Sequence, residues 1–223
     1  MSSSTPLPLA EPSVQVDPTA HPSGARTDRS RWRGPEAVAE HDLVAATAAA
    51  HGLLEALGID LRDESLARTP QRMAAALAEL MSPRPFEMTT FPNDGGYDEL
   101  IVARSIPVRS LCEHHMLPFV GTAHVGYLPG SRILGLSKLA RVVEHFSRRP
   151  QVQERLTVQV ANWLDAQLNP AGVGVVIEAE HLCMTLRGVQ SPGTTTVTSS
   201  LLGVLRTDPR SRAEFLALSR PAR

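Results

Sequence analysis

The stretch that decides the fold is DELIVARSIPVRSLCEHHMLPFVGTAHVGYLP, residues 98–129. Its first part, residues 98–108, is rich in aliphatic residues, and its last part, residues 118–129, alternates apolar with polar or small residues. Both patterns are typical of β-strands. Between them lies Cys-Glu-His-His, residues 112–115. The stretch therefore predicts two strands separated by a polar turn that carries a thiol and two imidazole groups.

Further elements are predicted on both sides of this stretch. They are helices over 35–58 and 69–81, a short strand near 133–134, a helix from 137 and a second from 150 to 169, strands over 172–188 and 194–205, and a helix over 208–218. Thr69 and Ser137 are expected to cap their helices, and Pro150 is expected to begin one. Because helices and strands are segregated along the chain, the pattern favours an α+β fold with an antiparallel β-sheet over alternating βαβ units.

The first 35 residues differ in composition from the rest. They hold six of the 18 prolines and many Ser and Thr, and they predict a disordered Pro/Ser-rich tail. We expect a helical region over 36–82 and a sheet-containing domain over 83–223. The chain shows neither a secretory signal nor an apolar run of membrane-spanning length, so we expect a cytoplasmic protein with reduced cysteines.

The charge balance bears on the class of partner. Lys and Arg number 22 and Asp and Glu 23, so the formal net charge is −1. A protein that coats nucleic acid usually carries a clear basic excess. We therefore expect neither nucleic acid nor a membrane as partner, and any anion site must be a local cluster of basic residues.

Both cysteines of the chain lie beside histidines. Cys112 and His115 have a spacing that suits a turn, and His181 and Cys183 are alternate residues of a predicted strand, which share a face. If the two segments are neighbours, a Cys₂His set forms and leaves a fourth position open, as in catalytic zinc sites. Spacing alone leaves open which of His114, His115 and His181 completes the set. It also leaves open a purely structural zinc site and a buried pair of free thiols.

A second pattern predicts an anion site, although the glycine-rich loops of nucleotide-binding proteins are missing. Ser137 stands at the start of a predicted helix, where free N–H groups and the helix dipole favour an anion. Lys138 and Arg141 follow it, and Arg187 has the same strand parity as Cys183. The simpler alternative is that Lys138 and Arg141 are solvated residues of a surface helix.

Glu154 lies near the start of the helix predicted from Pro150. An acid in the first turn stabilises the helix dipole, and by itself the sequence favours this simple role. The same carboxylate could also accept two N–H bonds from a ligand such as the edge of guanine.

Three segments resemble the zinc-dependent type of GTP cyclohydrolase I. They are SLCEHHMLPFVGTAHVGYLP, GLSKLARVVEHFSRRPQVQERLT and VVIEAEHLCMTLRGV, and the resemblance runs from about Thr69 to Leu216. It implies the tunnelling fold, an antiparallel sheet with a helix pair on one face, as the catalytic domain over 83–223. It implies conversion of GTP to 7,8-dihydroneopterin triphosphate with release of formate, the first step of tetrahydrofolate and pterin biosynthesis. It also implies a homodecamer of two pentamers with active sites between subunits.

The resemblance assigns the metal and proton chemistry to five residues. Cys112, His115 and Cys183 match the zinc ligands of the family. His114 and His181 match histidines that transfer protons. His181 would protonate N7 of guanine during hydrolysis at C8, and His114 would act at the ribose in later steps.

The resemblance also assigns substrate contacts. Glu154, with Gln153 beside it, matches the contact to the guanine ring. The residues that match triphosphate contacts are Ser137, Lys138, Arg141 and Arg187, together with Arg72 from a neighbouring subunit. Departures from the family pattern lie at Ser105, Val108 and Leu186, away from these positions.

A zinc site of Cys and His residues would also be found in proteins with two other functions. One is a non-catalytic protein of the same fold, braced by zinc, that binds a purine or pterin. The other is a zinc-dependent nucleobase deaminase, which is disfavoured because its H-x-E and P-C-x-x-C signature is absent from the sequence.

Overall fold

The computed structural model describes residues 40–220 of the chain. The predicted tail over 1–35, and residues 36–39 of the predicted helical region, lie outside the described residues. The elements in chain order are α1 (Leu43–Ala56), α2 (Thr69–Leu80), β1 (Thr90–Pro92), β2 (Ile101–Cys112), β3 (Pro118–Leu128), β4 (Arg132–Leu134), α3 (Ser137–Ser147), β5 (Pro150–Gln151), α4 (Gln153–Leu168), β6 (Gly172–His181), α5 (Leu182–Thr185), β7 (Thr195–Gly203), α6 (Val204–Thr207) and α7 (Pro209–Leu218).

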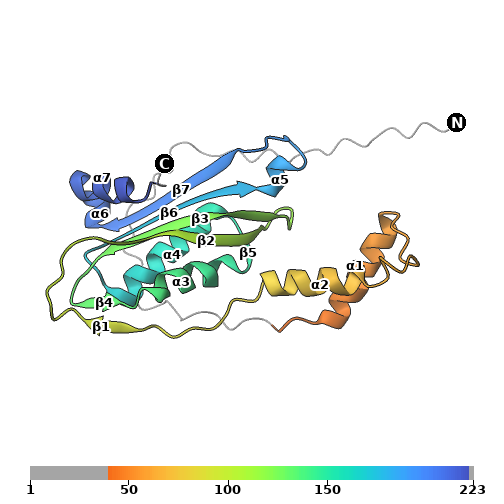
Figure 1. Ribbon diagram of the computed structural model, residues 1–223, viewed down its shortest axis with the longest axis horizontal. Helices are drawn as coiled ribbons and strands as arrows, with labels where there is room; N and C mark the ends of the chain where they lie inside the picture. Colours follow the sequence, from red (N-terminus) through yellow and green to blue (C-terminus); the bar gives the residue numbers. More distant parts are fainter. Residues whose placement is uncertain (1–39, 221–223) are drawn as a thin grey trace, which may run out of the picture. The chain divides into compact units, whose positions relative to one another are not determined.

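A five-stranded sheet with the order β5-β2-β3-β6-β7 is the framework (Figure 1). The strands from β2 to β7 pair antiparallel, while the short strand β5 pairs in parallel with β2 beside Leu111 and Cys112. β1 and β4 form a separate antiparallel pair. β2 has a bulge between Ala103 and Ile106, where Ser105 takes a φ of 55°. The predicted α+β fold with an antiparallel sheet is confirmed.

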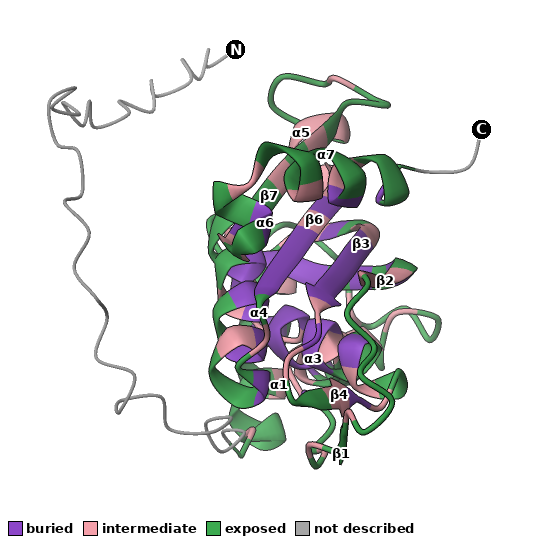
Figure 2. Ribbon diagram, turned by 90° about the vertical axis from the view of Figure 1, so that its left-hand side faces the viewer, coloured by how far each residue is buried: buried purple, intermediate pink, exposed green. Residues whose placement is uncertain are grey.

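One face of the sheet is covered by the helix pair α3 and α4. α3 packs on β2, and α4 packs on β6 and β7. Figure 2 shows that buried residues are concentrated in β3 and β6, at the middle of the sheet. Every second residue of β6 points into this core, namely Val173, Val175, Ile177 and Ala179. The helices contribute aliphatic residues, each worth about 1.5–3 kcal/mol when fully buried, so a core with few aromatic residues is still well stabilised.

A smaller core lies on the other face of the sheet. Phe215 of α7 packs there with Leu201 and Leu205, and Val176 of β6 packs against this cluster. Gly174 of β6 leaves the space that the ring occupies, since a Cβ built on it would lie 2.6 Å from Phe215 Cε1. The contact of Phe215 with Gly174 therefore holds α7 against the sheet.

Two predicted strands are shorter than the sequence patterns indicate. β6 ends at His181, and Cys183 lies in the helical turn α5. The prediction that His181, Cys183 and Arg187 share one face of a strand is therefore wrong, because the chain leaves the sheet before Cys183. β7 likewise ends at Gly203, where a φ of 57° takes the backbone out of the extended region and into α6.

Helix starts also differ from the predictions. Thr69 and Ser137 are the first helical residues rather than side-chain caps, and Pro150 belongs to β5, with α4 beginning three residues later. α1 begins only at Leu43, because the carboxylate of Asp42 accepts hydrogen bonds from two backbone N–H groups of its first turn. Within residues 40–220, no helix combines the length and apolar character needed to cross a membrane.

The Gly174–Phe215 contact gives a stability prediction. Gly174→Ala should lower the free energy of unfolding by about 1–3 kcal/mol, because the added methyl group displaces the buried ring of Phe215. Gly95→Ala is the matched control, since a Cβ at Gly95 meets no atom within 4 Å. Urea-unfolding midpoints measure both variants. Equal midpoints for the two would contradict the seating of α7 through Gly174.

Candidate metal and substrate site

The turn between β2 and β3 carries two of the predicted ligands. β2 ends at Cys112, and residues 113–115 turn the chain back toward β3. Two backbone hydrogen bonds close the turn, from Cys112 N to Leu117 O and from Met116 N to Cys112 O, each 2.8 Å long. Met116 takes a φ of 54°, which completes the reversal. These hydrogen bonds therefore fix the turn of the backbone that carries Cys112 and His115.

Cys183 reaches the same place from β6. β3 and β6 are paired so that Phe119 lies opposite His181. The chain then leaves the sheet and makes the single helical turn α5, which carries Cys183. The ligand atoms of Cys112, His115 and Cys183 all lie within 4.8 Å of one another. The two cysteine segments thus converge, through a helical turn rather than through strand parity.

The three donors suit a zinc ion. Two thiolates and one imidazole make three corners of a tetrahedron and leave the fourth free for water or substrate. Cys112 and Cys183 are both buried and form no disulfide. Burial raises the pKa of the Cys183 thiol, and the neighbouring Cys112 raises that pKa further. A divalent cation would favour the thiolates, so the chemistry of this donor set fits a bound metal.

His114 lies beside this cluster. Its Nδ1 is 3.7 Å from Cys112 Sγ, and Nδ1 of His115 is 3.6 Å from the same sulfur. The rings of His114 and His115 stand edge to face, with centroids 6.2 Å apart. The set of ligand atoms that lie within 4.8 Å of one another contains His115 and not His114, so it favours His115 as the third ligand.

His181 is held from two sides at the end of β6. Its ring stacks on Phe119, with centroids 4.6 Å apart and an angle of 11° between the planes. Its Nε2 lies 2.8 Å from Oε1 of Gln153. Burial lowers the pKa of His181, and the carboxylate of Glu154 acts in the opposite direction. The imidazole is thus fixed in place two residues before Cys183 in the chain.

Gln153 and Glu154 open α4 but differ in exposure. Gln153 is only 1% exposed, and its side chain contacts His181 and the strands of the sheet. Glu154 is exposed and near enough to His181 to influence its pKa. The structure therefore brings both predicted residues to His181, but only Glu154 presents its side chain to solvent.

An ion pair that the sequence analysis missed braces the turn. Arg155 of α4 donates from Nη2 to the carboxylate of Glu113, and from Nε to Oε1 of the buried Gln151 at 2.9 Å. The Arg155 guanidinium lowers the pKa of Glu113. Glu113 lies in the quoted Cys-Glu-His-His motif, but its partner is 42 residues away, and no spacing rule points to it.

The predicted triphosphate contacts on α3 start at the end of that helix which does not lead to Cys112. Ser137 and Lys138 are at the start of α3, next to the β1–β4 pair, because Gly135 N donates to Thr89 O. The other end of α3 leads into β5, which pairs with β2 at Cys112 (Figure 1). Eleven residues of helix separate these ends by about 16 Å.

The other two predicted basic contacts, Arg187 and Arg72, lie in different places. Arg187 lies beside the cluster, with Nη1 3.5 Å from the carbonyl oxygen of Cys183. Arg72 is exposed on α2. Of the predicted basic residues, only Arg187 has a hydrogen bond in the described residues that links it to a cluster residue.

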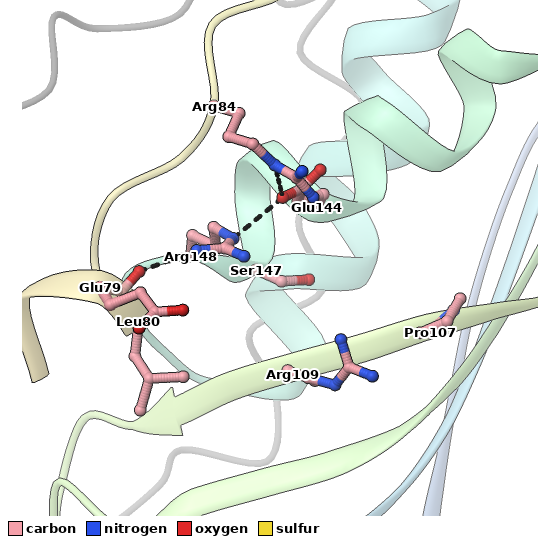
Figure 3. A pocket seen from close by; sticks show the side chains of 8 residues that line it. All are labelled: Glu79, Leu80, Arg84, Pro107, Arg109, Glu144, Ser147 and Arg148. Atoms are coloured by element: carbon pink, nitrogen blue, oxygen red, sulfur yellow. Dashed lines mark hydrogen bonds and ion pairs between the residues drawn. The ribbon is translucent and has the colours of Figure 1, made fainter. Parts of the chain in front are cut away.

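A pocket of about 270 Å³ opens between α2, β2 and α3 (Figure 3). Its arginines Arg84 and Arg148 share the carboxylate of Glu144, with contacts of 2.7 and 3.0 Å. Arg148 also donates to the carbonyl oxygen of Glu79 at 2.8 Å, which joins the end of α2 to α3. None of the predicted site residues lines this pocket, and the contacts of Arg84 and Arg148 join α3 to α2 and the segment that follows it.

Comparison with known proteins agrees with the site. The sequence profile described as GTP cyclohydrolase I matches residues 46–220. A protein named GTP cyclohydrolase 1 from Synechococcus sp. (strain JA-3-3Ab) is 53% identical over 180 residues, which is 79% of each chain. The protein of the same name from Aquifex aeolicus (strain VF5) is 53% identical over 165 residues, or 74% of this chain and 90% of that one.

Two further proteins are less similar to this chain. The GTP cyclohydrolase 1 of Homo sapiens is 46% identical over 197 residues, covering 85% of this chain and 79% of the human one. The solved apo structure of the archaeosine synthase QueF-Like matches 47% of this chain and 93% of its own, with a TM-score of 0.39 and 18% identity. Given a profile match over most of the chain and relatives that are about half identical, the chain belongs to the GTP cyclohydrolase I family.

Proposed function

We propose that this protein opens the imidazole ring of GTP by hydrolysis at C8, releases formate and closes the product to 7,8-dihydroneopterin triphosphate. The observation that carries this function is the convergence of Cys112, His115 and Cys183, with His114 in contact with Cys112 and His181 two residues before Cys183, in a chain of the GTP cyclohydrolase I family. This step would feed tetrahydrofolate and other pterin biosynthesis. A protein that only bound a purine or pterin would not need His114 and His181 next to a metal cluster.

The proposed metal ligands are Cys112, His115 and Cys183, with zinc as the cofactor. When bound, zinc supplies Lewis acidity and a water molecule that is deprotonated near neutral pH. His181 transfers a proton to N7 of guanine, which makes C8 electrophilic. His114, 3.7 Å from Cys112 Sγ, lies close enough to the same centre to transfer protons at the ribose in later steps.

The exposed Glu154 is the proposed anchor for guanine. Its carboxylate can accept two N–H bonds from the edge of the base, while its backbone position at the start of α4 keeps it next to His181. Arg187 is hydrogen-bonded to the backbone carbonyl of Cys183. We propose that it contacts the phosphates from the side of the substrate that lies at the cluster. The residues proposed to bind the base and the metal therefore belong to the same chain.

The phosphates are proposed to be bound by a neighbouring chain. Ser137, Lys138 and Arg141 lie on the first half of α3, and Ser137 is about 16 Å and Arg141 about 9 Å along the helix from the end that leads toward Cys112. A substrate whose base lies at the cluster of one chain would take its phosphate contacts from that helix, and from Arg72, of another. This separation supports active sites between subunits, and with the family resemblance it supports a homodecamer of two pentamers.

The cytoplasm is the proposed location. Cys112 and Cys183 are free thiols in the structure, and the proposed ligand role requires that they stay reduced. Reducing compartments keep such thiols from forming disulfides.

The activity itself is tested with purified protein and GTP. Formate release and the fluorescence of the oxidised product should both appear, and both should be lost after chelation and return when zinc is added. Zinc that binds stoichiometrically without any formate release would contradict the enzymatic function and fit a binding protein.

Cys183→Ser should lose zinc and formate release together, because two ligands do not hold the metal as three do. His114→Ala is the matched control, since it removes a neighbouring imidazole and should retain zinc. The zinc content per subunit, measured by elemental analysis, distinguishes the two variants. Full zinc content in Cys183→Ser would remove Cys183 from the ligand set.

His181→Ala should keep most of the zinc yet slow opening of the ring at C8 by about 10²–10⁴-fold, the usual contribution of a positioned acid or base. Arg62→Gln, which breaks an exposed ion pair with Asp60, is the control. Formate release under single-turnover conditions is the measurement. A near-normal rate would mean that another group protonates N7.

Sharing of the site between chains is tested by mixing inactive subunits. A chain with Lys138→Ala and Arg141→Ala, coexpressed with a His181→Ala chain, should regain activity, because about one quarter of the sites in a random mixture combine two intact halves. Coexpression of His114→Ala with His181→Ala should regain none, since both residues belong to one cluster. Activity no higher than the sum of the separate variants would place the phosphate contacts in the same chain as the metal.

A further inference from the structure

The side-chain amide of Gln153 has one possible orientation. Its nitrogen donates to the carbonyl oxygens of Ile177 and Thr196, at 3.1 and 2.9 Å, and lies 3.1 Å from Oγ1 of Thr198. Carbonyl oxygens can only accept hydrogen bonds. A flipped amide would direct its oxygen at two other oxygens in a buried place, so the nitrogen must face the strands and Oε1 must face His181.

This orientation decides which nitrogen of His181 carries a hydrogen. Oε1 of Gln153 can only accept, and it lies 2.8 Å from Nε2 of His181. Nε2 is therefore the protonated nitrogen of the neutral ring. Nδ1 is then the nitrogen of the neutral ring that carries the lone pair.

Phe119 and Gln153 constrain the ring of His181 in different ways. Phe119 is fully buried and stacks on the imidazole, so it sets the plane of the ring. The hydrogen bond to Gln153 sets the rotation of the ring within that plane. Gln153 itself is anchored to β6 and β7 and is almost fully buried, and all of its polar atoms are engaged within the chain.

We propose that Gln153 is a positioning residue that holds His181 in one tautomer and orientation, rather than the substrate contact suggested by its place beside Glu154. The role rests on the proposed function, in which His181 protonates guanine. In that step the bond from Nδ1 to its proton breaks, the Nδ1 electron pair stays on the ring, and the lone pair of guanine N7 forms the new N–H bond. The neutral ring that results keeps its hydrogen on Nε2, still bonded to Gln153, so no second rearrangement is needed.

Gln153→Met tests the role, because methionine has a similar length but offers His181 no amide oxygen. We expect kcat for formate release to fall by about 10–100-fold, as for other residues that orient a catalytic group, with KM little changed and zinc retained. Gln153→Glu, as the neutral acid that burial favours, keeps an acceptor toward His181 and one hydrogen for the carbonyl oxygens of Ile177 and Thr196, so it should lose less kcat than Gln153→Met. Thr198→Val, which leaves both carbonyl acceptors of the amide in place, is the control and should stay near the wild-type rate.

The same substitutions in a His181→Ala chain give the deciding comparison. If Gln153 acts through His181, changing it should cost nothing further in single-turnover formate release once His181 is absent. Should Gln153→Met fail to assemble, the loss caused by Gln153→Glu must vanish in the His181→Ala chain in the same way.

Four results would overturn the inference. They are a raised KM with an unchanged kcat, an equal loss with and without His181, an equal loss for Gln153→Met and Gln153→Glu, and a wild-type rate in Gln153→Met. A wild-type chain that releases no formate would contradict the proposed function itself. A wild-type rate that survives Gln153→Met would contradict only the role of Gln153.

Discussion

The antiparallel pairing of β3 with β6 is the constraint on which the site depends. Its register runs without interruption from Phe119 opposite His181 to Leu128 opposite Gly172. A slip of one residue would exchange the two faces of a strand, and would turn Glu178 and Glu180 toward the helices in place of Ile177 and Ala179. The cost of burying two carboxylates excludes that register. The hydrophobic core therefore decides where β6 ends, and with it where the turn bearing Cys183 lies relative to Cys112.

The two-residue strand β5 adds a second constraint at the same end of the sheet. By pairing with Leu111 and Cys112 it places the start of α4 against the polar turn. Three consecutive residues of α4 then serve different purposes: Gln153 orients His181, Glu154 faces solvent, and Arg155 holds Glu113. Because these polar groups are bonded to one another, a group of buried or half-buried polar side chains can exist here without a large desolvation penalty.

The basic residues of α3 are not explained by the stability of the isolated chain. The overall charge is nearly neutral, but Lys138 and Arg141 stand in the first half of α3, where cations oppose the helix dipole. This arrangement is slightly unfavourable in an isolated chain and favourable when an anion binds. Since the helix carries these residues away from the metal cluster, the chain by itself holds two separate halves of the machinery that the family resemblance implies.

Much of the fold could be predicted from local patterns. Period-two segments predicted β2 and β3, helical spacing predicted α2 and the helix pair, and the Cys and His residues near 112 and 181 predicted a metal site. The resemblance, rather than spacing, separated His115 from His114. Local patterns could not show that Cys183 leaves the strand, since the apolar run continues through Leu182 and Met184 although the sheet pairing ends at His181. Nor could they show that Gln153 is buried or that Arg155 pairs with Glu113.

What the sequence by itself determined was the type of each element, the α+β class and the set of chemical groups available. What only the tertiary structure decided was which of those groups meet. Periodicity records the environment of a residue relative to its near neighbours, within a turn of helix or two residues of strand. The bond from Gln153 to His181 spans 28 residues and that from Arg155 to Glu113 spans 42, so both arise from the register of the sheet and the seating of α4. Long-range partners of this kind leave no local period, because the same residue types at the same positions would suit a solvated surface equally well.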